Sequence, residues 1–295
     1  MGKSHASIPG LDRDRLVGMA FRMLGTVSDA EDAVQEAFIR WYRLDDHVRS
    51  SVTNPVGWFA KTTSRICLDV LKSSTRRHET YVGPWLPEPI PDSRFRVGLT
   101  VSGEDPLDRA EQGEAVSMAL LTIMETMTPA ERVAFVLMDV FGYSATDITE
   151  VLERSPGAIR QLASSARARL AKSERPDGPG NTALTQAFQQ ATLTGDVEAL
   201  LHILHPEVTL RSDGGGVVRA ALNPVYGAHR VARFLLGVLA KQVPTTLVPH
   251  ETSTAPVLLF THEGEVSGVL ELSAGSGGIH EILIQWNPQK LDLWR

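Results

Sequence analysis

The stretch Ser144–Leu170, SATDITEVLERSPGAIRQLASSARARL, decides the fold of the N-terminal half of the chain. It contains two segments that begin with a serine, a common helix N-cap, at Ser144 and Ser155, and only a short turn separates them. Five apolar residues of the second segment share one helical face: Ile159, Leu162, Ala163, Ala166 and Leu170. The pattern predicts a helix-turn-helix, whose second helix would lie in the major groove of DNA.

The face opposite these apolar residues carries the candidate DNA contacts Ser155, Arg160, Gln161, Ser164 and Arg167. Arginine pairs with guanine edges or phosphates, and glutamine pairs with adenine. A small helical bundle with a solvated arginine face is the alternative. Residues 154–172 hold five basic residues and no acidic one, which favours DNA.

Helical sequence also precedes the helix-turn-helix, from about Asp108 to Met127. Thr128-Pro129-Ala130-Glu131 then supplies an N-cap threonine, a proline at the first helical position and the glutamate of a capping box. We therefore expect an all-α module over residues 108–173.

Residues 1–80 predict a second all-α module. Apolar residues at helical spacing run from Leu16 to Arg43, with a break at residues 25–28, and indicate a helical hairpin. Another helix begins at Asn54-Pro55 and should run to about Arg77.

This last helix carries a continuous basic stripe with one acidic residue in it, and Trp58 lies near its start. The stripe consists of Lys61, Arg65, Asp69, Lys72, Arg76 and Arg77. Asp69 is spaced to hold Arg65 and Lys72 in place, and Trp58 offers a face for an unstacked base. The alternative is a surface helix stabilised by ion pairs, with Trp58 in the core.

The hairpin presents a negative face made of Asp29, Glu31, Asp32, Gln35 and Glu36. Such a face suits a protein partner and repels DNA. The alternative is that acidic residues in a first turn only complement the helix dipole.

Composition limits the remaining possibilities. The chain has 295 residues, a formal net charge of -6 and one cysteine, Cys67, which excludes a disulfide framework and a cysteine-rich zinc site. The first ten residues lack the apolar stretch of a signal peptide, and no run approaches a membrane span, so we expect a cytoplasmic protein. No metal-ligand cluster or phosphate-binding glycine loop indicates a cofactor.

Two segments rich in proline or glycine, residues 81–107 and 173–181, divide the chain. Beyond them, residues 181–295 alternate helical stretches (184–204 and 228–241) with β-rich ones (257–261, 266–272 and 280–286), which predicts a separate α+β domain. Five residues of this domain could supply acid-base chemistry if they converged: His202, His205, Asp213, Tyr226 and His229. A tight turn after Asp213 and a packing face at His202 explain them at least as well, so we expect no catalysis.

The order of these elements over residues 11–172 resembles the extracytoplasmic-function sigma factors. The stretch Asp29–Phe38 looks like that family's helix for the clamp of RNA polymerase, formed by the beta-prime subunit. The segment Asn54–Phe59, with the basic helix after it, resembles the part that opens and reads the minus-ten promoter element. The same resemblance implies that the helix at 156–171 reads the minus-35 element.

Three further motifs resemble those of sigma factors fused to a SnoaL-like domain, a cone-shaped α+β barrel. They are Trp85-Leu86-Pro87-Glu88-Pro89, Asp213-Gly214-Gly215-Gly216 and Asn287-Pro288-Gln289-Lys290-Leu291. Val217 departs from the pattern, which usually has lysine after the glycines, and this puts a charge-dependent role of that position in doubt. The resemblance implies a regulatory domain whose mouth can bind a small-molecule ligand, and does not by itself make the domain catalytic.

These observations predict a sigma factor with RNA polymerase core and promoter DNA as partners, regulated in cis by its C-terminal domain. We expect Trp85–Pro89 to dock near Asp213–Gly216 or Asn287–Leu291, because prolines lower the entropy lost on docking and Trp85 is a large apolar anchor. One alternative is a helix-turn-helix regulator with a ligand-sensing domain, against which the acidic hairpin argues. Another is a SnoaL-like enzyme with a helical appendage.

Overall fold

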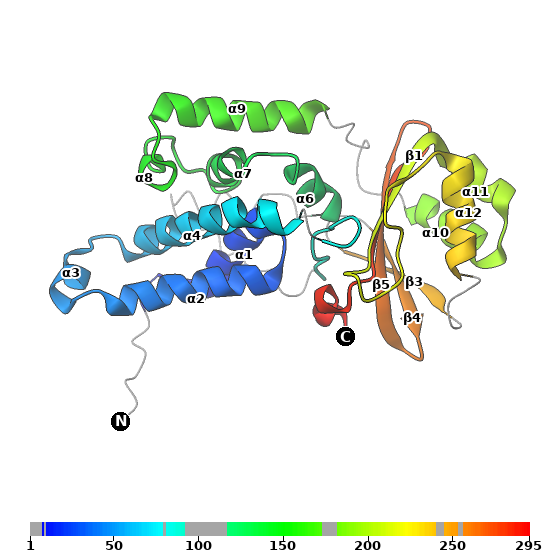
Figure 1. Cartoon of the computed structure of the whole chain (residues 1–295), viewed down its shortest axis with the longest axis horizontal. Helices are drawn as coiled ribbons and strands as arrows, with labels where there is room; N and C mark the ends of the chain where they lie inside the picture. The colour runs from blue at the N-terminus through cyan, green and yellow to red at the C-terminus, as the bar shows by residue number, and fades with distance from the viewer. Residues whose placement is uncertain are drawn as a thin grey trace. The chain divides into compact units, whose positions relative to one another are not determined.

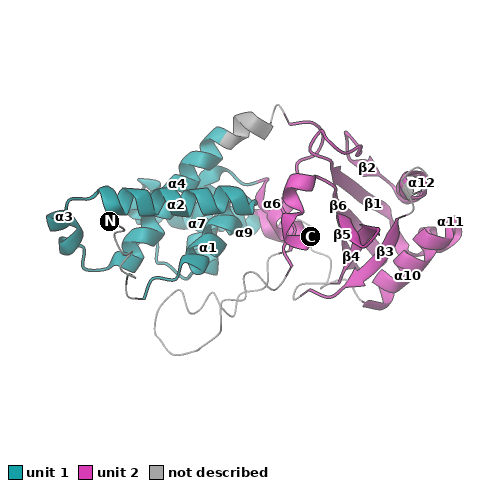
Figure 2. Ribbon diagram, turned by 90° about the horizontal axis from the view of Figure 1, so that it is seen from below, with its two compact units in different colours: residues 1–76, 95–113, 127–168 teal, residues 77–94, 114–126, 169–295 magenta. Residues whose placement is uncertain are grey.

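The computed structural model describes residues 8, 10–78, 81–91, 117–172, 182–239, 245–252 and 256–295 (Figure 1). The chain forms two compact units, shown in different colours in Figure 2. Unit 1 takes its described residues from 8–76 and 127–168, and unit 2 takes its own from 77–91, 117–126 and 169–295.

The first part of unit 1 contains the predicted helical hairpin and basic helix. Its helices are α1 (Arg13–Leu24), α2 (Val27–Arg43), α3 (Asp46–Ser51) and α4 (Pro55–His78). Asp12 caps α1 through the backbone N–H groups of Asp14 and Arg15, and Gly25 ends it in the left-handed conformation, at φ 80°. Thr26 caps α2 only two residues after α1 ends, which makes the hairpin tight.

The second part of unit 1 contains α7 (Pro129–Phe135), the π-helical turn η2 (Val136–Val140), α8 (Thr149–Leu152) and all but the last turn of α9 (Pro156–Lys172). The capping box expected at Thr128 and Glu131 is present. A helix was also expected to begin at Ser144, but residues 145–148 form turns and α8 begins only at Thr149. The Ser144 hydroxyl and the Asp147 carboxylate do bond each other's backbone N–H, so the polar signal there specifies a turn.

Arg132 joins the two parts of unit 1. Its guanidinium is buried and donates a hydrogen bond of 3.0 Å to the carbonyl oxygen of Met23, in the last turn of α1. The last carbonyls of a helix lack partners within it and carry partial negative charge, so a cation there is stabilising. The guanidinium of Arg22 also lies over the Phe141 ring, 5.8 Å from its centroid.

Unit 2 is built on one six-stranded sheet with the order β2-β1-β6-β5-β4-β3. The strands are β1 (Leu204–Asp213), β2 (Val225–Tyr226), β3 (Thr246–His250), β4 (Val257–His262), β5 (Glu265–Gly275) and β6 (Gly278–Gln285). β1 and β6 pair in parallel, and the other neighbouring strands pair antiparallel. The α+β class is as expected, although only the last three strands were predicted from the sequence.

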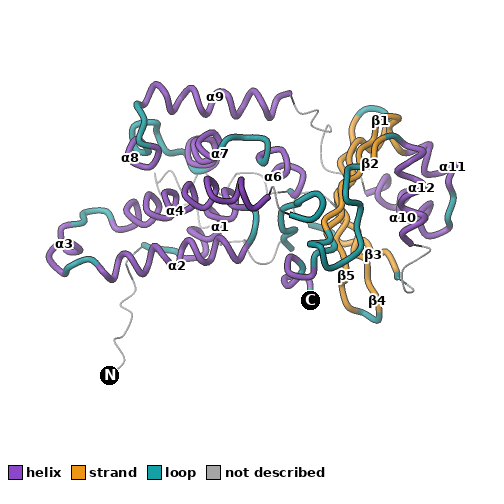
Figure 3. The backbone as a smooth tube through the Cα atoms, viewed as in Figure 1, coloured by secondary structure: helices purple, strands orange, loops and turns teal. Residues whose placement is uncertain are grey.

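Helices α10 (Thr182–Thr194), α11 (Val197–Ile203) and α12 (Ala228–Leu239) cover one face of this sheet (Figure 3). Alternate residues of the central strands face these helices and form the main core with them. In β5 and β6 these residues are Leu270, Leu272, Ile282 and Ile284.

The other face of the sheet carries the intervening residues of the same strands, including Glu271, Leu283 and Gln285. Three pieces of unit 2 cover it: residues 81–91, helix α6 (Met118–Met124) and the C-terminal 3-10 turns Pro288–Lys290 and Asp292–Trp294. Residues 81–91 belong to the segment expected to be a linker, and Leu86 in it is fully buried. The rest of that segment, and the helical start expected near Asp108, lie outside the described residues.

Candidate promoter-binding and regulatory sites

Helix α9 presents the polar face that its sequence predicts. The side chains of Arg160, Gln161, Ser164 and Arg167 are exposed, while Ile159, Ala163 and Ala166 are fully buried. Ser155 accepts a hydrogen bond of 3.3 Å from the backbone N–H of Ala158, so its hydroxyl caps the helix. Arg167 forms an ion pair of 2.7 Å with Asp139.

The basic stripe of α4 contacts the start of the helix-turn-helix within unit 1. The Lys61 ammonium forms an ion pair of 3.1 Å with the carboxylate of Glu150 in α8. Arg65 donates to the backbone carbonyl of Glu150 and lies 3.6 Å from the carboxylate of Glu153. Two cations expected to contact DNA are therefore paired with acidic residues of the same chain in this conformation.

Further along α4, Asp69 forms an ion pair of 3.7 Å with Lys72, and both side chains are well exposed. The structure pairs Arg65 with α8, so Asp69 supports only one of the two expected neighbours. Side chains of Arg76 and Arg77 lie outside the described residues. Trp58 is half-buried and packs edge-on against Trp41, with ring centroids 5.0 Å apart.

The acidic face of α2 is divided between local and outward roles. Asp29 lies in the first turn of the helix, where the dipole alternative places it, and accepts a hydrogen bond of 2.7 Å from the Thr26 hydroxyl. Glu36 pairs with Arg40 one turn later, at 2.9 Å. Asp32 and Gln35 are exposed, and Glu31 is half-buried.

A network of hydrogen bonds in unit 2 joins residues 81–91 to the sheet. We call it the linker-binding cluster, and its members are Tyr81, Leu86, Asp213, Gln285 and Lys290. One oxygen of Asp213 accepts hydrogen bonds from the backbone N–H of Leu86, at 3.0 Å, and from the Lys290 ammonium, at 2.8 Å. Lys290 also donates to the Leu86 carbonyl, at 2.6 Å, and the Gln285 amide donates to the Pro87 carbonyl, at 3.1 Å. The expected docking of Trp85–Pro89 near Asp213 and Lys290 is therefore present in the structure.

Aromatic rings surround the buried ammonium group of Lys290. It lies 4.2 Å from the centroid of the Trp85 ring and 5.2 Å from that of Tyr81. Burial lowers the pKa of Lys290, and the charge of Asp213 acts in the opposite direction. Burial also raises the pKa of Tyr81, whose hydroxyl donates to Asp213 at 2.7 Å. An ion pair removed from water in this way requires well-placed partners on every side.

The glycines after Asp213 and the motif near the C-terminus meet at this cluster. A Cβ atom on Gly214 would lie 2.0 Å from the Val218 carbonyl oxygen, and one on Gly215 would lie 2.5 Å from the Asn287 amide. The Asn287 amide donates to the Tyr81 hydroxyl at 3.1 Å, and Leu291 is fully buried. Val217, the departure from the motif, is 72% exposed.

The end of the Trp85–Pro89 motif is buried as well. Glu88 and Pro89 are both buried, and the Trp294 indole donates to the Pro89 carbonyl at 2.8 Å.

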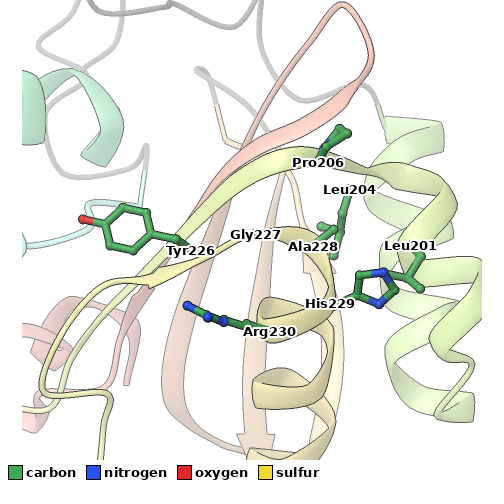
Figure 4. Close-up of a pocket in the computed structure, with 8 residues that line it drawn as sticks. All are labelled: Leu201, Leu204, Pro206, Tyr226, Gly227, Ala228, His229 and Arg230. Carbon is green, nitrogen blue, oxygen red and sulfur yellow. The ribbon is translucent and has the colours of Figure 1, made fainter.

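The five candidate acid-base residues do not converge on one site. Asp213 belongs to the linker-binding cluster, and the His205 ring stacks on that of His280, with centroids 4.0 Å apart. The His202 ring is exposed and contacts the carbonyl of Glu198, one turn back along α11. Tyr226 and His229 line a pocket of about 400 Å³ at the start of α12, but their rings point to opposite sides (Figure 4).

Within the described part of the chain, no group of three or more His, Cys, Asp or Glu residues could hold a metal ion. None of the described helices is long and apolar enough to cross a membrane.

Sequence reasoning missed three residues that matter here: Tyr81, Gln285 and Glu271. Gln285 and Glu271 left a weak signal, because each is a polar residue between two large apolar neighbours in a strand. If both faces of the sheet are covered, a polar strand residue such as Gln285 or Glu271 must be buried, and a buried polar side chain requires a specific hydrogen-bond partner.

Comparisons with known proteins agree with this architecture. The family model for sigma-70 region 2 matches residues 12–77, and the one for sigma-70 region 4 matches residues 117–170. The chain is 37% identical to the ECF RNA polymerase sigma factor SigJ of Mycobacterium tuberculosis over 237 residues, which are 79% of this chain and 72% of that protein. It is 36% identical to a probable ECF RNA polymerase sigma factor of the same species, SigI, over 95% of this chain and 92% of the relative.

The crystal structure of M. tuberculosis SigJ has a TM-score of 0.69 to this structure, with 30% identity over 95% of each chain. The similarity therefore extends through both helical parts and the α+β domain. From its sigma-70 regions and these relatives, the chain belongs to the extracytoplasmic-function (ECF) sigma factors, a group of alternative sigma factors of RNA polymerase.

Proposed function

We propose that this sigma factor binds core RNA polymerase through the acidic face of α2 and reads promoter DNA through α4 and α9. The exposure of Asp32 and Gln35 on α2, and of Arg160 and Gln161 on α9, supports these two roles. Basic and aromatic side chains would stabilise the opened promoter strands, and no covalent chemistry would be needed. A protein with these partners acts in the cytoplasm.

We propose further that the C-terminal domain regulates initiation in cis. The observation that carries this proposal is the Lys290–Asp213 pair, which binds Leu86 in the segment between sigma-70 regions 2 and 4. A segment bound in this way cannot extend freely, so the domain would control how far apart the two DNA-reading regions can move.

A small-molecule ligand of the C-terminal domain stays a prediction. The pocket at the start of α12 is its candidate site, since its lining includes Tyr226, His229 and Arg230. All three side chains are exposed, so the pocket gives no buried polar group that would select one ligand class.

Reconstitution with core polymerase tests the sigma function. The wild-type chain should bind core polymerase and direct transcription from its own promoter. The double variant Asp32→Arg with Glu36→Arg should lose polymerase binding and keep its fold, because both side chains are on the surface. The matched control is Glu198→Arg, a charge reversal on α11 of unit 2. Retained polymerase binding by the double variant would overturn the role of the α2 face.

A further inference from the structure

Helix α6 is the first helix of the residues that match sigma-70 region 4, yet it packs on the C-terminal sheet in unit 2. Its contact with the sheet centres on Glu271 of β5. One carboxylate oxygen of Glu271 accepts a hydrogen bond of 2.9 Å from the backbone N–H of Met118, and the other accepts one of 3.0 Å from Ala119. Glu271 thus satisfies two N–H groups that the first turn of a helix leaves without a partner in the helix.

Apolar side chains enclose this contact. The buried cluster beside it consists of Leu86, Met118 and Leu283, and Ala119 packs against this cluster. Glu271 itself is only 6% exposed. Burial raises the pKa of Glu271 to about 7, and the two backbone N–H bonds lower it. The negative charge of Glu281 also raises the pKa of Glu271. Glu281 in turn forms an ion pair with Arg211.

A role in ordinary packing does not explain a carboxylate at this position. Burying a charged or polar group costs free energy, and an apolar residue of similar size would fill the same space without that cost. Local capping does not replace it either, because Ser117 caps α6 only through the N–H of Leu120 and leaves the N–H groups of Met118 and Ala119 to Glu271. Glu271 lies 153 residues along the chain from Met118, and its two hydrogen bonds fix both the position and the direction of the helix start.

We propose that Glu271 is a positioning residue that holds the first helix of region 4 on the C-terminal domain and so controls when region 4 is free to assemble for promoter binding. The proposal rests on the regulation in cis proposed above and adds a second point of control, separate from the linker-binding cluster. The cluster holds the segment before region 4, whereas Glu271 holds the first helix of region 4.

Amide hydrogen exchange on the full chain tests the contact without any need for transcription. In Glu271→Ala the N–H groups of Met118 and Ala119 should exchange at least about tenfold faster than in the wild type, because local opening then costs less. Glu271→Gln keeps one acceptor oxygen and should fall between the two. The matched control is Glu265→Ala, an exposed glutamate on the same strand. Unchanged protection of Leu270 and Leu272 in β5 would show that each variant is folded.

Transcription from the cognate promoter with core polymerase then tests the regulation. Glu271→Ala should change the initiation rate at least about threefold relative to both the wild type and Glu265→Ala, as expected for a coupling free energy of ordinary size. Wild-type exchange at Met118 and Ala119 in Glu271→Ala would overturn the contact. Faster exchange with an unchanged initiation rate would overturn its regulatory role. Failure of the wild-type chain to initiate would instead contradict the proposed sigma function.

Discussion

The ammonium group of Lys290 lies 2.8 Å from a carboxylate oxygen of Asp213, and the two side chains are 8% and 0% exposed. Both groups also bind the backbone of Leu86. The partners that stabilise this buried pair are therefore supplied by a segment more than 120 residues away in the sequence. Loss of that segment from the cluster would leave the charges poorly solvated, so docking and the stability of the pair depend on each other.

Removal of one charge should be costly. Lys290→Ala leaves Asp213 buried without its cation, and we expect the free energy of unfolding of unit 2 to fall by about 3–5 kcal/mol. Denaturant titration of the full chain measures this change. Combining Lys290→Met with Asp213→Leu should recover part of the loss, because no unpaired charge remains. A loss below about 1 kcal/mol for Lys290→Ala would indicate that the pair is open to water in solution.

Trp85 and Lys290 should act together. Their contact of 4.2 Å is a cation–π interaction, which is stronger when it is removed from water. We expect Trp85→Ala and Lys290→Ala to have non-additive effects on stability in a double-mutant cycle. Trp85→Ala should also expose residues 81–91 to proteolysis. Additive effects would show that the indole ring and the ammonium do not interact in solution.

Stability should depend on pH through Glu271. Its pKa rises from 4.5 to about 7 in the folded chain, so the folded state holds the proton more tightly. The resulting stabilisation is fully present below pH 4.5 and is lost as the pH rises through about 7, by about 3 kcal/mol at most. The wild type should therefore lose stability relative to Glu271→Gln between pH 5 and pH 8. A difference that stays constant over this range would contradict the burial of Glu271.

The ion pairs between α4 and α8 should weaken DNA binding by the free protein. Lys61 cannot contact a phosphate while it pairs with Glu150, but both side chains are partly exposed, so the pair contributes at most about 1 kcal/mol. Glu150→Gln should raise affinity for a promoter fragment up to about fivefold at low salt, as measured by fluorescence anisotropy. Glu198→Gln removes the same charge in unit 2 and should have no such effect. Equal affinities for the two variants would show that Glu150 does not restrain Lys61.

Helices were the part of the fold that the sequence predicted best, because their signals are local. The Thr128 capping box, the proline starts of α4 and α9 and the glycine between α1 and α2 all lie where the structure has helix ends. The turn at residues 145–148 was the exception, since the same Ser144–Asp147 hydrogen bonds serve a helix start or a turn. Strand β1 was missed because its pairing with β6 depends on residues about 70 positions away.

The exposed polar face of α9 was predictable, because it follows from helical periodicity within one segment; its role in DNA binding stays a prediction. The buried polar contacts of unit 2 were not predictable, because each joins residues that lie far apart in the sequence. Asp213 suits a tight turn, an acid-base site and a buried ion pair equally well, and only the position of Lys290 decides between them. The partners of Glu271 were even harder to predict than those of Asp213, because they are backbone N–H groups, which every sequence contains.

Promoter-dependent transcription by the full-length Lys290→Met variant tests regulation by the C-terminal domain most directly. The substitution removes the hydrogen bond from Lys290 to the Leu86 carbonyl and leaves the residues of α2, α4 and α9 unaltered, so polymerase binding should match that of the wild type. We predict that the variant initiates at a clearly different rate from the wild type on the same promoter, and that Trp85→Ala shifts the rate in the same direction. Identical rates for all three proteins over a range of salt concentrations, with released residues 81–91 confirmed by proteolysis, would contradict regulation through the linker-binding cluster.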